Sequence, residues 1–249
     1  MKTISILAFA LVAGLAVHAG EQRFASGPSR TSLLELYTSE GCSSCPSAER
    51  WLGALRGQAG LWRDFVPVEF HVNYWDRLGW PDRFATREFT QRQYAHAAAW
   101  GSGSIYTPCF IRDGAEWHNN MELRSVAGAT AGTLAVVLGE GGRCRVEFSP
   151  VAAAGGLAAY DVHVAWLGGG ITSRVTAGEN RGETLKHEFV ALALSSHELS
   201  TAAGGSALHA EFSLPPPAVG AMPRRSLAAW VTRRGELAAV QATGGWVQE

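Results

Sequence analysis

Two cysteines in a C-x-x-C pattern, Cys42 and Cys45, are the residues of this chain whose types and spacing best suit chemistry. They follow an apolar, strand-like stretch, 32–37, and precede a helix-like stretch, 46–56, that begins with a proline. At the start of a helix the backbone N–H groups and the dipole stabilise an anion, so the pKa of the first cysteine falls and its thiolate becomes a nucleophile near neutral pH. Zinc sites use the same spacing, but a strand before it and a helix after it favour thiol–disulfide chemistry.

The N-terminus predicts export, which agrees with that chemistry. Lys2 begins a short positive region, an almost unbroken apolar run covers 4–17, and small residues before Gly20 offer a cleavage point. The run is shorter than the roughly 20 residues that span a bilayer, so we interpret residues 1–19 as a signal peptide. We therefore expect the mature protein to be periplasmic or secreted, with no membrane span after removal of the signal.

Composition excludes several classes of partner. The chain has 249 residues, 47% of them hydrophobic, and a formal net charge of −1. That balance offers no basic surface to nucleic acid, so we expect no nucleic acid as a partner. Four cysteines are too few for a disulfide scaffold, and each needs its own explanation. No cofactor is indicated by the sequence.

Up to about residue 137, the hydrophobic pattern alternates between strands and helices. The predicted elements are strand 32–37, helix 47–56, strand 66–73, helix 82–99, hairpin strands 105–112 and 115–118, and helix 121–137. Asp113-Gly114 between the hairpin strands is a strong two-residue turn signal. Asn120 suits the N-cap of the last helix. The order is therefore β-α-β-α-β-β-α.

From about residue 140 the pattern changes to short alternating apolar runs. Gly- or Pro-rich turns separate these runs, at 155–156, 168–170, 204–205 and 215–217. About seven strands without a helical period predict an antiparallel β-sandwich. We expect this half to dock a partner or to cover one side of the redox site, with 178–182 as a turn in which Asn180 is structural.

The order of the elements, with the C-x-x-C pair after the first strand and Thr107-Pro108 at the start of the hairpin, resembles the thioredoxin fold. The resemblance implies that Cys42 is the attacking thiol, Cys45 the resolving thiol, and Pro108 a cis-proline whose backbone faces the sulfurs. Thioredoxins also keep a buried acid in the strand before the motif. Glu35 is the corresponding residue, and burial beside apolar neighbours would raise its pKa.

Four separated motifs are similar to those of a narrower family. They are ELYTSEGCSSCP at 35–46, HVNYWD at 71–76, YTP at 106–108 and GENRG at 178–182. In this order they identify the chain as a member of a secreted bacterial family of unknown function, DUF1223, within the thioredoxin-like superfamily. Where thioredoxins usually carry an aromatic residue before the first cysteine, this chain has Gly41. We therefore expect an α/β thioredoxin-like domain over 30–138, followed by an all-β, sandwich-like domain over 140–249.

The predicted function is thiol–disulfide exchange on protein thiols or disulfides. One alternative is a metal-binding or metallochaperone module that uses Cys42, Cys45 and also His71, although a closed zinc site needs four ligands. Another is a non-enzymatic interaction protein in which the cysteines form a structural disulfide. His71 itself is either a base or metal ligand near the cysteines or a histidine satisfied within the core.

The loop after the second strand is a candidate substrate site, because ligands bind at the carboxyl ends of strands in α/β sheets. Tyr74, Trp75 and Trp80 on this loop, together with Thr107, are predicted to line a peptide groove. The alternative is that the aromatic residues cap the core and hold the loop.

The other two cysteines leave three interpretations open. Cys109 and Cys144 form a disulfide between the two halves, or both are buried free thiols, or Cys109 is a third active-site thiol.

Overall fold

The protein is mainly β-structure in the computed structural model, and twelve strands belong to one mixed sheet. The structure describes residues 15–118, 123, 129–151, 158–201, 206–217 and 222–248. The predicted signal peptide, 1–19, lies largely outside the described residues, and residues 15–18 have no regular secondary structure. None of the described helices is both long enough and apolar enough to cross a membrane.

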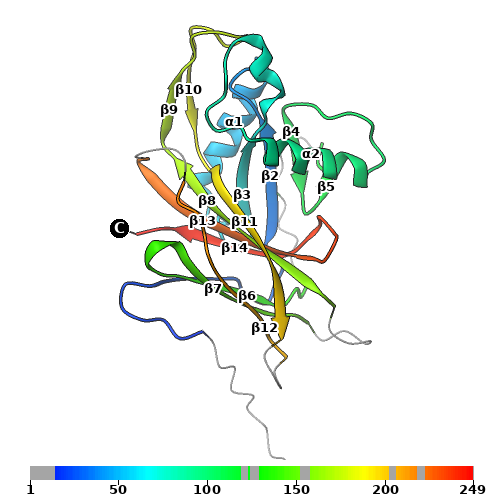
Figure 1. The fold of residues 1–249 in the computed structure, drawn as a ribbon, viewed down its shortest axis with the longest axis vertical. Coiled ribbons are helices and arrows are strands. Elements are labelled where there is room, and N and C mark those ends of the chain that lie inside the picture. Colours follow the sequence, from blue (N-terminus) through cyan, green and yellow to red (C-terminus); the bar gives the residue numbers. More distant parts are fainter. Residues whose placement is uncertain are drawn as a thin grey trace, which may run out of the picture.

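Strands outnumber helices in the described chain as a whole (Figure 1). The strands are β1 (Gln22–Ala25), β2 (Ser32–Thr38), β3 (Phe65–His71), β4 (Cys109–Arg112), β5 (Ala115–Glu116), β6 (Thr133–Leu138), β7 (Arg143–Ser149), β8 (Tyr160–Gly169), β9 (Ile171–Arg174), β10 (Thr184–His187), β11 (Val190–Thr201), β12 (Leu208–Ser213), β13 (Arg224–Arg233) and β14 (Ala239–Trp246). The helices are α1 (Cys45–Ala54), α2 (Arg87–Ala99) and the short 3-10 helices η1 (Leu55–Gly57), η2 (Asn73–Leu78) and η3 (Glu140–Gly142).

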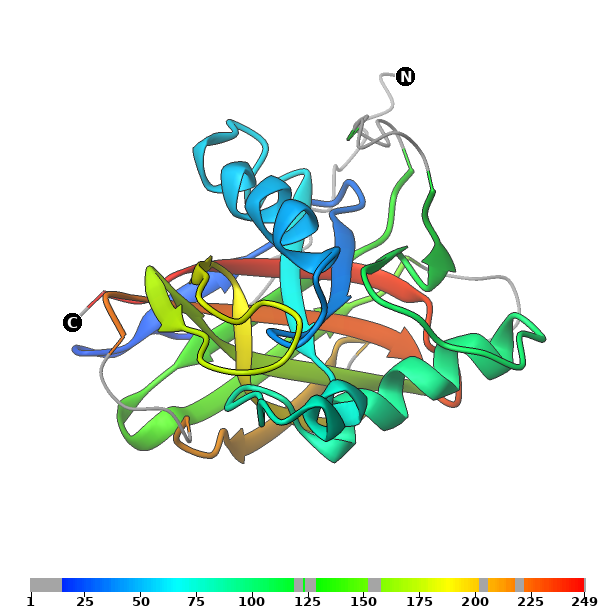
Figure 2. The same ribbon diagram turned by 90° about the horizontal axis from the view of Figure 1, so that it is seen from above.

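Strands β2 and β3 position the candidate site. They run parallel, with Leu36 opposite Glu69, and every residue of both strands is buried. Successive side chains of a strand point to opposite faces, so Leu36 and Thr38 lie on one face of β2 and Glu35 on the other. Helix α1 covers the first face and α2 the second, on opposite sides of the sheet (Figure 2).

Strand β11 joins the two halves of the chain. Val190, its first residue, is the parallel partner of Glu69 in β3, and most of the strand then runs antiparallel to β8. Ser200 and Thr201 at its far end pair with β12. The predicted α/β thioredoxin-like domain followed by a separate sandwich-like domain is therefore wrong. A twelve-residue strand with a register shift between Ala191 and Ala193 places strands from both halves in one sheet.

The predicted helix 121–137 is also wrong where the structure describes it. Residues 133–138 form β6, which pairs with β1 on one side and β7 on the other. This run of Leu, Ala, Val, Val and Leu contains β-branched residues that favour a strand, and it is buried after Thr133. Residues 119–122 and 124–128, with the predicted N-cap Asn120, lie outside the described residues.

Other local predictions are confirmed with shorter bounds. The hairpin β4–β5 turns at Asp113 and Gly114, whose φ angles are 51° and 86°. Two positive φ values match the turn type that this dipeptide favours. Helix α2 begins at Arg87 and not near residue 82, because Thr86 caps it: Thr86 Oγ1 accepts a hydrogen bond from the N–H of Phe89.

Two large apolar cores lie on opposite sides of the sheet formed by β8 and β13. One is shared with β2, β3 and the helices, and Trp230 of β13 is fully buried in it. The other lies against β1, β6, β7 and β12 and includes Phe148 and Val164. Because alternate residues of β8 and β13 contribute to different cores, these strands hold the helical part of the protein against the β-rich part.

Candidate functional site

Cys42 and Cys45 form a disulfide at the N-terminal end of α1, with Cα atoms 5.4 Å apart. The helix begins at Cys45, with Ser44 as its N-cap. Pro46 follows in the first turn, where its missing N–H has no partner within the helix to lose. The disulfide therefore lies between β2 and α1, where the sequence predicts the reactive pair.

Thr107 and Trp75 adjoin this disulfide. The Thr107–Pro108 peptide bond is cis, as the resemblance implies. The carbonyl oxygen of Thr107 lies 3.8 Å from the Sγ atom of Cys42. The indole Nε1 of Trp75 donates a hydrogen bond of 2.8 Å to Thr107 Oγ1, so residues from three separate loops meet at the first cysteine.

Gly41 allows Trp75 to pack directly on the cysteine loop. A Cβ atom at position 41 would lie only 3.0 Å from Cβ of Trp75. The aromatic residue next to the cysteines thus comes from the loop after β3.

The other two aromatic residues predicted to bind substrate make contacts within the protein. Tyr74 lies beside Trp75, and its hydroxyl is 3.4 Å from Oε1 of Gln93 in α2. The Trp80 indole instead donates a hydrogen bond of 2.7 Å to the carboxylate of Glu40. That Tyr74, Trp75, Trp80 and Thr107 bind a substrate stays a prediction.

Both sulfur-bearing residues are covered. Cys42 and Cys45 are each 0% exposed. An attacking thiol is expected to be more exposed than its resolving partner, and the structure does not show this difference. The turn 178–182 contributes to this cover. Asn180 Nδ2 donates hydrogen bonds to the carbonyl oxygens of Glu40 and Cys42, at 2.8 and 2.9 Å.

A further contact from the same turn reaches the segment between the cysteines. Glu179 Oε2 accepts a hydrogen bond of 3.0 Å from the N–H of Ser43. This exposed carboxylate has a lowered pKa, chiefly because of that N–H group. The second half of the chain therefore covers one side of the disulfide, and Asn180 has the structural role that the sequence predicts.

Glu35 lies on the α2 face of β2, away from α1. Its carboxylate accepts hydrogen bonds from Nε and Nη2 of Arg92, at 2.8 and 3.0 Å, and from the hydroxyl of Tyr37, at 3.0 Å. Burial raises the pKa of Glu35, but the charges of Arg92 and His96 together lower it well below its ordinary value. The expected raised pKa is therefore wrong, because sequence reasoning missed Arg92.

A buried polar network fills the α1 face beneath the cysteine loop. Its members are four carboxylates and two histidines, all at most 4% exposed: Glu40, Glu49, Glu69, Asp82, His71 and His187. His71 bridges two acids, with Nδ1 2.6 Å from Asp82 Oδ2 and Nε2 2.8 Å from Glu69 Oε1. His187 Nε2 lies 3.1 Å from Glu40 Oε1. His71 is therefore part of a cluster and not a lone core histidine.

The network is tied directly to the cysteine loop and to α1. The backbone N–H of Glu40 donates to Asp82 Oδ2 at 2.8 Å, and Thr38 Oγ1 donates to Glu49 Oε1 at 2.6 Å. Glu49 is four residues after Cys45, so it extends from the same side of α1 as that cysteine.

The charges within the network shift the pKa values of its members. Burial, followed by the charge of Glu69, raises the pKa of Glu49 to about 7. Burial opposes protonation of His187, but hydrogen bonds with Glu40 and Glu69 outweigh it and raise the pKa to about 9. For His71 the charge of Asp82 likewise outweighs burial and raises the pKa well above its usual value.

Sequence reasoning missed most of this network, because its members are spread from residue 40 to residue 187 without a fixed spacing. A signal was present in β3, where Glu69 and His71 occupy alternate positions of an otherwise apolar strand. Charged side chains are almost never fully buried unless they are paired. An acid in a strand predicted to be buried therefore indicates a partner elsewhere in the chain.

The remaining cysteines are buried free thiols, which confirms one of the three interpretations. Cys109 and Cys144 form no disulfide. Burial raises the pKa of Cys109 to about 11 and that of Cys144 to about 12. The raised pKa disfavours the thiolate of both residues near neutral pH, and the thiolate is the reactive form.

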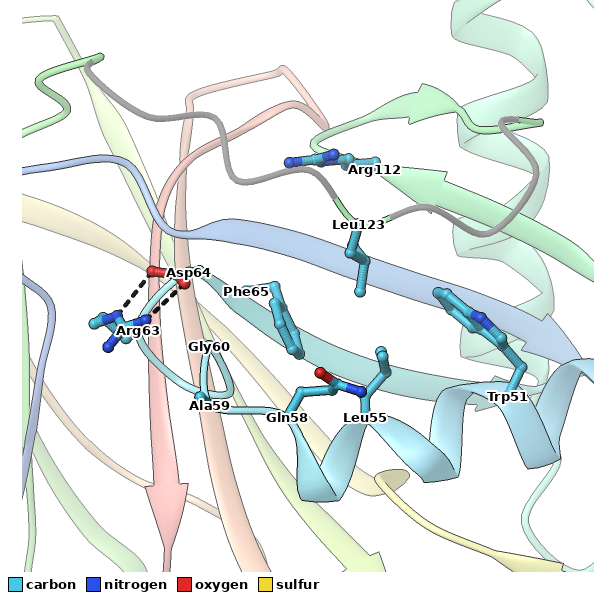
Figure 3. Close-up of a pocket in the computed structure, with 10 residues that line it drawn as sticks. All are labelled: Trp51, Leu55, Gln58, Ala59, Gly60, Arg63, Asp64, Phe65, Arg112 and Leu123. Atoms are coloured by element: carbon cyan, nitrogen blue, oxygen red, sulfur yellow. Dashed lines mark hydrogen bonds and ion pairs between the residues drawn. The ribbon is translucent and has the colours of Figure 1, made fainter.

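A separate pocket of about 420 Å³ lies alongside the C-terminal part of α1 and the segment that follows it (Figure 3). Its lining residues are Trp51, Leu55, Gln58, Ala59, Gly60, Arg63, Asp64, Phe65, Arg112 and Leu123. At one end the Arg63 guanidinium pairs with the Asp64 carboxylate at 2.9 Å. None of the predicted site residues lines this pocket, so we do not assign the redox site to it.

Residues 33–232 match the protein family described as Protein of unknown function (DUF1223). The chain belongs to the DUF1223 family. Its placement in the thioredoxin-like superfamily stays a prediction. No curated protein matches the sequence of this DUF1223 chain.

Two solved structures resemble the DUF1223 chain in fold. A crystal structure of a protein from Agrobacterium tumefaciens has 22% sequence identity and a TM-score of 0.63, over 88% of this chain and 95% of that one. HBP35 of Porphyromonas gingivalis has 13% identity and a TM-score of 0.57, over 88% of this chain and 76% of that one. At these identities the likeness concerns the fold alone.

Proposed function

We propose that this DUF1223 protein performs thiol–disulfide exchange through Cys42 and Cys45, on protein thiols or disulfides outside the cytoplasm. The observation that carries the proposal is the disulfide at the N-terminus of α1, with the carbonyl of Thr107 3.8 Å from Cys42 Sγ. Two elements distant in sequence thus frame the first sulfur, and an extended partner segment beside Thr107 would meet that sulfur.

The chemistry follows from the position of the pair. A partner thiolate attacks Sγ of Cys42, the Cys42–Cys45 bond breaks, and its electron pair passes to the sulfur of Cys45. A second partner thiolate then attacks the partner sulfur of this mixed disulfide, which releases the partner as a disulfide and leaves both cysteines reduced. The helix N-terminus stabilises the thiolates that form, and Ser44 Oγ, 3.3 Å from Cys42 Sγ, can donate a hydrogen bond to one of them.

Exchange requires the cover over the sulfurs to open. On one side the cover is held by the three hydrogen bonds from Glu179 and Asn180, and on the other by the bond between Trp75 and Thr107. Each of the three bonds made by Asn180 and Trp75 contributes about 1 kcal/mol net, and Glu179 is exposed to solvent. Breaking these hydrogen bonds to open the cover therefore costs a few kcal/mol. A cost of this size permits local opening, and thus reaction of the sulfurs, without global unfolding.

A structural disulfide is the second candidate, because the full burial of both cysteines favours it. In that case the pair would fix the loop between β2 and α1 and would not react with partners. The two candidates differ in whether the folded protein forms mixed disulfides.

Trapping variants distinguish the candidates. In the reverse direction the Cys42 thiolate attacks a partner disulfide, and Cys45 then displaces the partner. We therefore expect Cys45→Ser to accumulate mixed disulfides with partners through Cys42, because the displacing thiol is absent. Cys42→Ser should trap far less, and Cys109→Ser, which removes a buried thiol, is the matched control and should trap nothing. If Cys45→Ser and Cys42→Ser are both folded and both fail to trap a partner, the structural-disulfide function replaces the proposed one.

A further inference from the structure

Four side chains of the buried network converge on one point beneath the cysteine loop. They are Glu49 of α1, Glu69 and His71 of β3, and His187 at the end of β10. Each offers one oxygen or nitrogen atom, and these four atoms all lie within 4.8 Å of one another. Three segments of the fold, one of them from the second half of the chain, therefore supply two imidazole nitrogens and two carboxylate oxygens to a single place.

The outer sides of both histidines are already held by other acids. Asp82 lies at Nδ1 of His71 and Glu40 at Nε2 of His187, at 2.6 and 3.1 Å. Each ring therefore turns its other nitrogen toward the two glutamates. A histidine that binds a metal is almost always oriented in this way, by a carboxylate or carbonyl at its second nitrogen.

Two atoms of the residues at this point have no hydrogen-bond partner within the described part of the chain: Nδ1 of His187, which faces the two glutamates, and the second carboxylate oxygen of Glu69. His187 Nδ1 lies 3.5 Å from both Glu49 Oε2 and Glu69 Oε1, which is too far for a good hydrogen bond, and Glu69 Oε2 is also unpaired. Both residues are fully buried. A buried polar atom without a partner destabilises the fold, so this arrangement suits a ligand that contacts His187 Nδ1.

The charge of the network indicates the sign of that ligand. The ion pairs of the four carboxylates are with the two histidines. Four carboxylates outnumber two imidazoles, so full ionisation of the acids would leave net negative charge in the protein interior even with both imidazoles protonated. A buried net charge of this size is unfavourable unless it is paired or binds a metal.

We propose that Glu49, Glu69, His71 and His187 bind one divalent metal ion, and that zinc fits the site best. Four nitrogen and oxygen ligands without an open position suit a tetrahedral zinc site with metal–ligand distances of about 2.0–2.2 Å. Calcium and magnesium favour all-oxygen sites, and the imidazoles argue against them. The two separations of 3.5 Å from His187 Nδ1 match the spacing of about 3.3–3.5 Å between ligand atoms in such a tetrahedron. His71 Nε2 and Glu69 Oε1, now hydrogen-bonded at 2.8 Å, would move apart by about 0.5 Å when the ion replaces their shared proton.

The ion would join α1, β3 and β10 directly below the disulfide. Because Glu40 precedes Cys42 by two residues and holds His187, the metal site and the cysteine loop support each other's positions. The proposal does not rest on thiol–disulfide exchange. It also uses none of the cysteines, so it differs from a thiolate metal site at Cys42 and Cys45.

Metal binding by the mature protein with its disulfide intact tests the proposal. After treatment with a chelator and its removal, zinc is titrated in competition with a chromophoric chelator. We expect one zinc ion per chain, and the same stoichiometry in the Cys42→Ser/Cys45→Ser double variant. His187→Gln removes a ligand, so its zinc affinity should fall at least as much as the roughly 10- to 100-fold that follows loss of a residue that only orients a ligand. His209→Gln, at a half-exposed histidine outside the network, is the matched control and should bind as the wild type does.

X-ray absorption of the zinc-loaded wild type keeps the test decisive if His187→Gln does not fold. We expect only nitrogen and oxygen neighbours at about 2.0–2.1 Å and no sulfur at about 2.3 Å. Absence of stoichiometric binding, sulfur coordination, or an affinity that His187→Gln leaves unchanged would each overturn the proposal. The reduction potential of the disulfide is a separate quantity, so failure here leaves the proposed thiol exchange to its own test.

Discussion

The two faces of β2 and β3 bury carboxylates in contrasting ways. On the α2 face, Glu35 meets the guanidinium of Arg92 in two hydrogen bonds, so one negative charge faces one permanent positive charge. On the α1 face, four carboxylates share two histidines. Arginine stays protonated at all ordinary pH values, so the charge of Glu35 is always balanced. On the α1 face the charge balance of the acids depends on bound protons or on a bound cation. The α2 face thus holds a complete, structural ion pair. The α1 face, below the disulfide, holds the unbalanced cluster of titratable groups that is typical of functional sites.

The largest effect should come from breaking the complete pair. Arg92→Met leaves Glu35 buried without a counter-charge, and removal of one partner of a buried pair typically destabilises a protein by about 3–5 kcal/mol. Urea unfolding followed by circular dichroism measures this loss. The double variant Arg92→Met/Glu35→Gln should recover a large part of it, and a double variant as unstable as the single one would contradict an ion-pair role.

Acid should weaken the same pair. The pKa of Glu35 is lower in the folded protein than in the unfolded chain, so the folded state binds fewer protons. The stabilisation is therefore fully present above the ordinary glutamate pKa of about 4.5 and is lost as the pH falls below it. We expect the free energy of unfolding to fall less between pH 6 and pH 3 in Glu35→Gln than in the wild type. Equal pH dependence in both proteins would exclude this residue as a source of acid sensitivity.

On the α1 face, loss of the cover should expose the disulfide at moderate cost. Asn180→Ala removes two hydrogen bonds to the cysteine loop, which should lower stability by about 1–3 kcal/mol. The carbonyl oxygen of Glu40 loses its Asn180 donor, whereas that of Cys42 keeps the N–H of Cys45. Dithiothreitol should then reduce the Cys42–Cys45 bond faster than in the wild type, as measured by alkylation and mass spectrometry. Arg181→Ala, at an exposed neighbour in the same turn, is the control. Equal reduction rates in Asn180→Ala and wild type would show that this turn does not limit access.

The smallest effect concerns the two free thiols. Burial and raised pKa values predict that Cys109 and Cys144 do not react with iodoacetamide at pH 7.5 in the folded protein, and that both react after unfolding in urea. Peptide mapping by mass spectrometry locates the label. Rapid labelling of Cys109 in the folded state would return it to consideration as an active-site thiol.

The sequence predicted the elements around the disulfide because their signals are local. The spacing of Cys42 and Cys45, the proline at 46 and the Asp113-Gly114 turn each depend on a few neighbouring residues. Resemblance supplied the cis peptide at Pro108, and the GENRG motif marked the turn that holds Asn180.

The rest could not be predicted because it depends on pairing between distant segments. The apolar run 133–138 is compatible with a buried helix or a buried strand, and only its neighbours β1 and β7 decide the outcome. The parallel pairing of Val190 with Glu69 has no sequence signal. His187 and Glu49 likewise meet only because β10 packs on α1.

The reduction potential of the Cys42–Cys45 pair tests the proposed function most directly. The mature protein is equilibrated in glutathione or dithiothreitol buffers of known potential, and the reduced fraction is counted by alkylation. We expect a value between about −120 and −270 mV, the range of proteins that exchange disulfides. A value well below about −300 mV would place the pair among structural disulfides and contradict the proposed function.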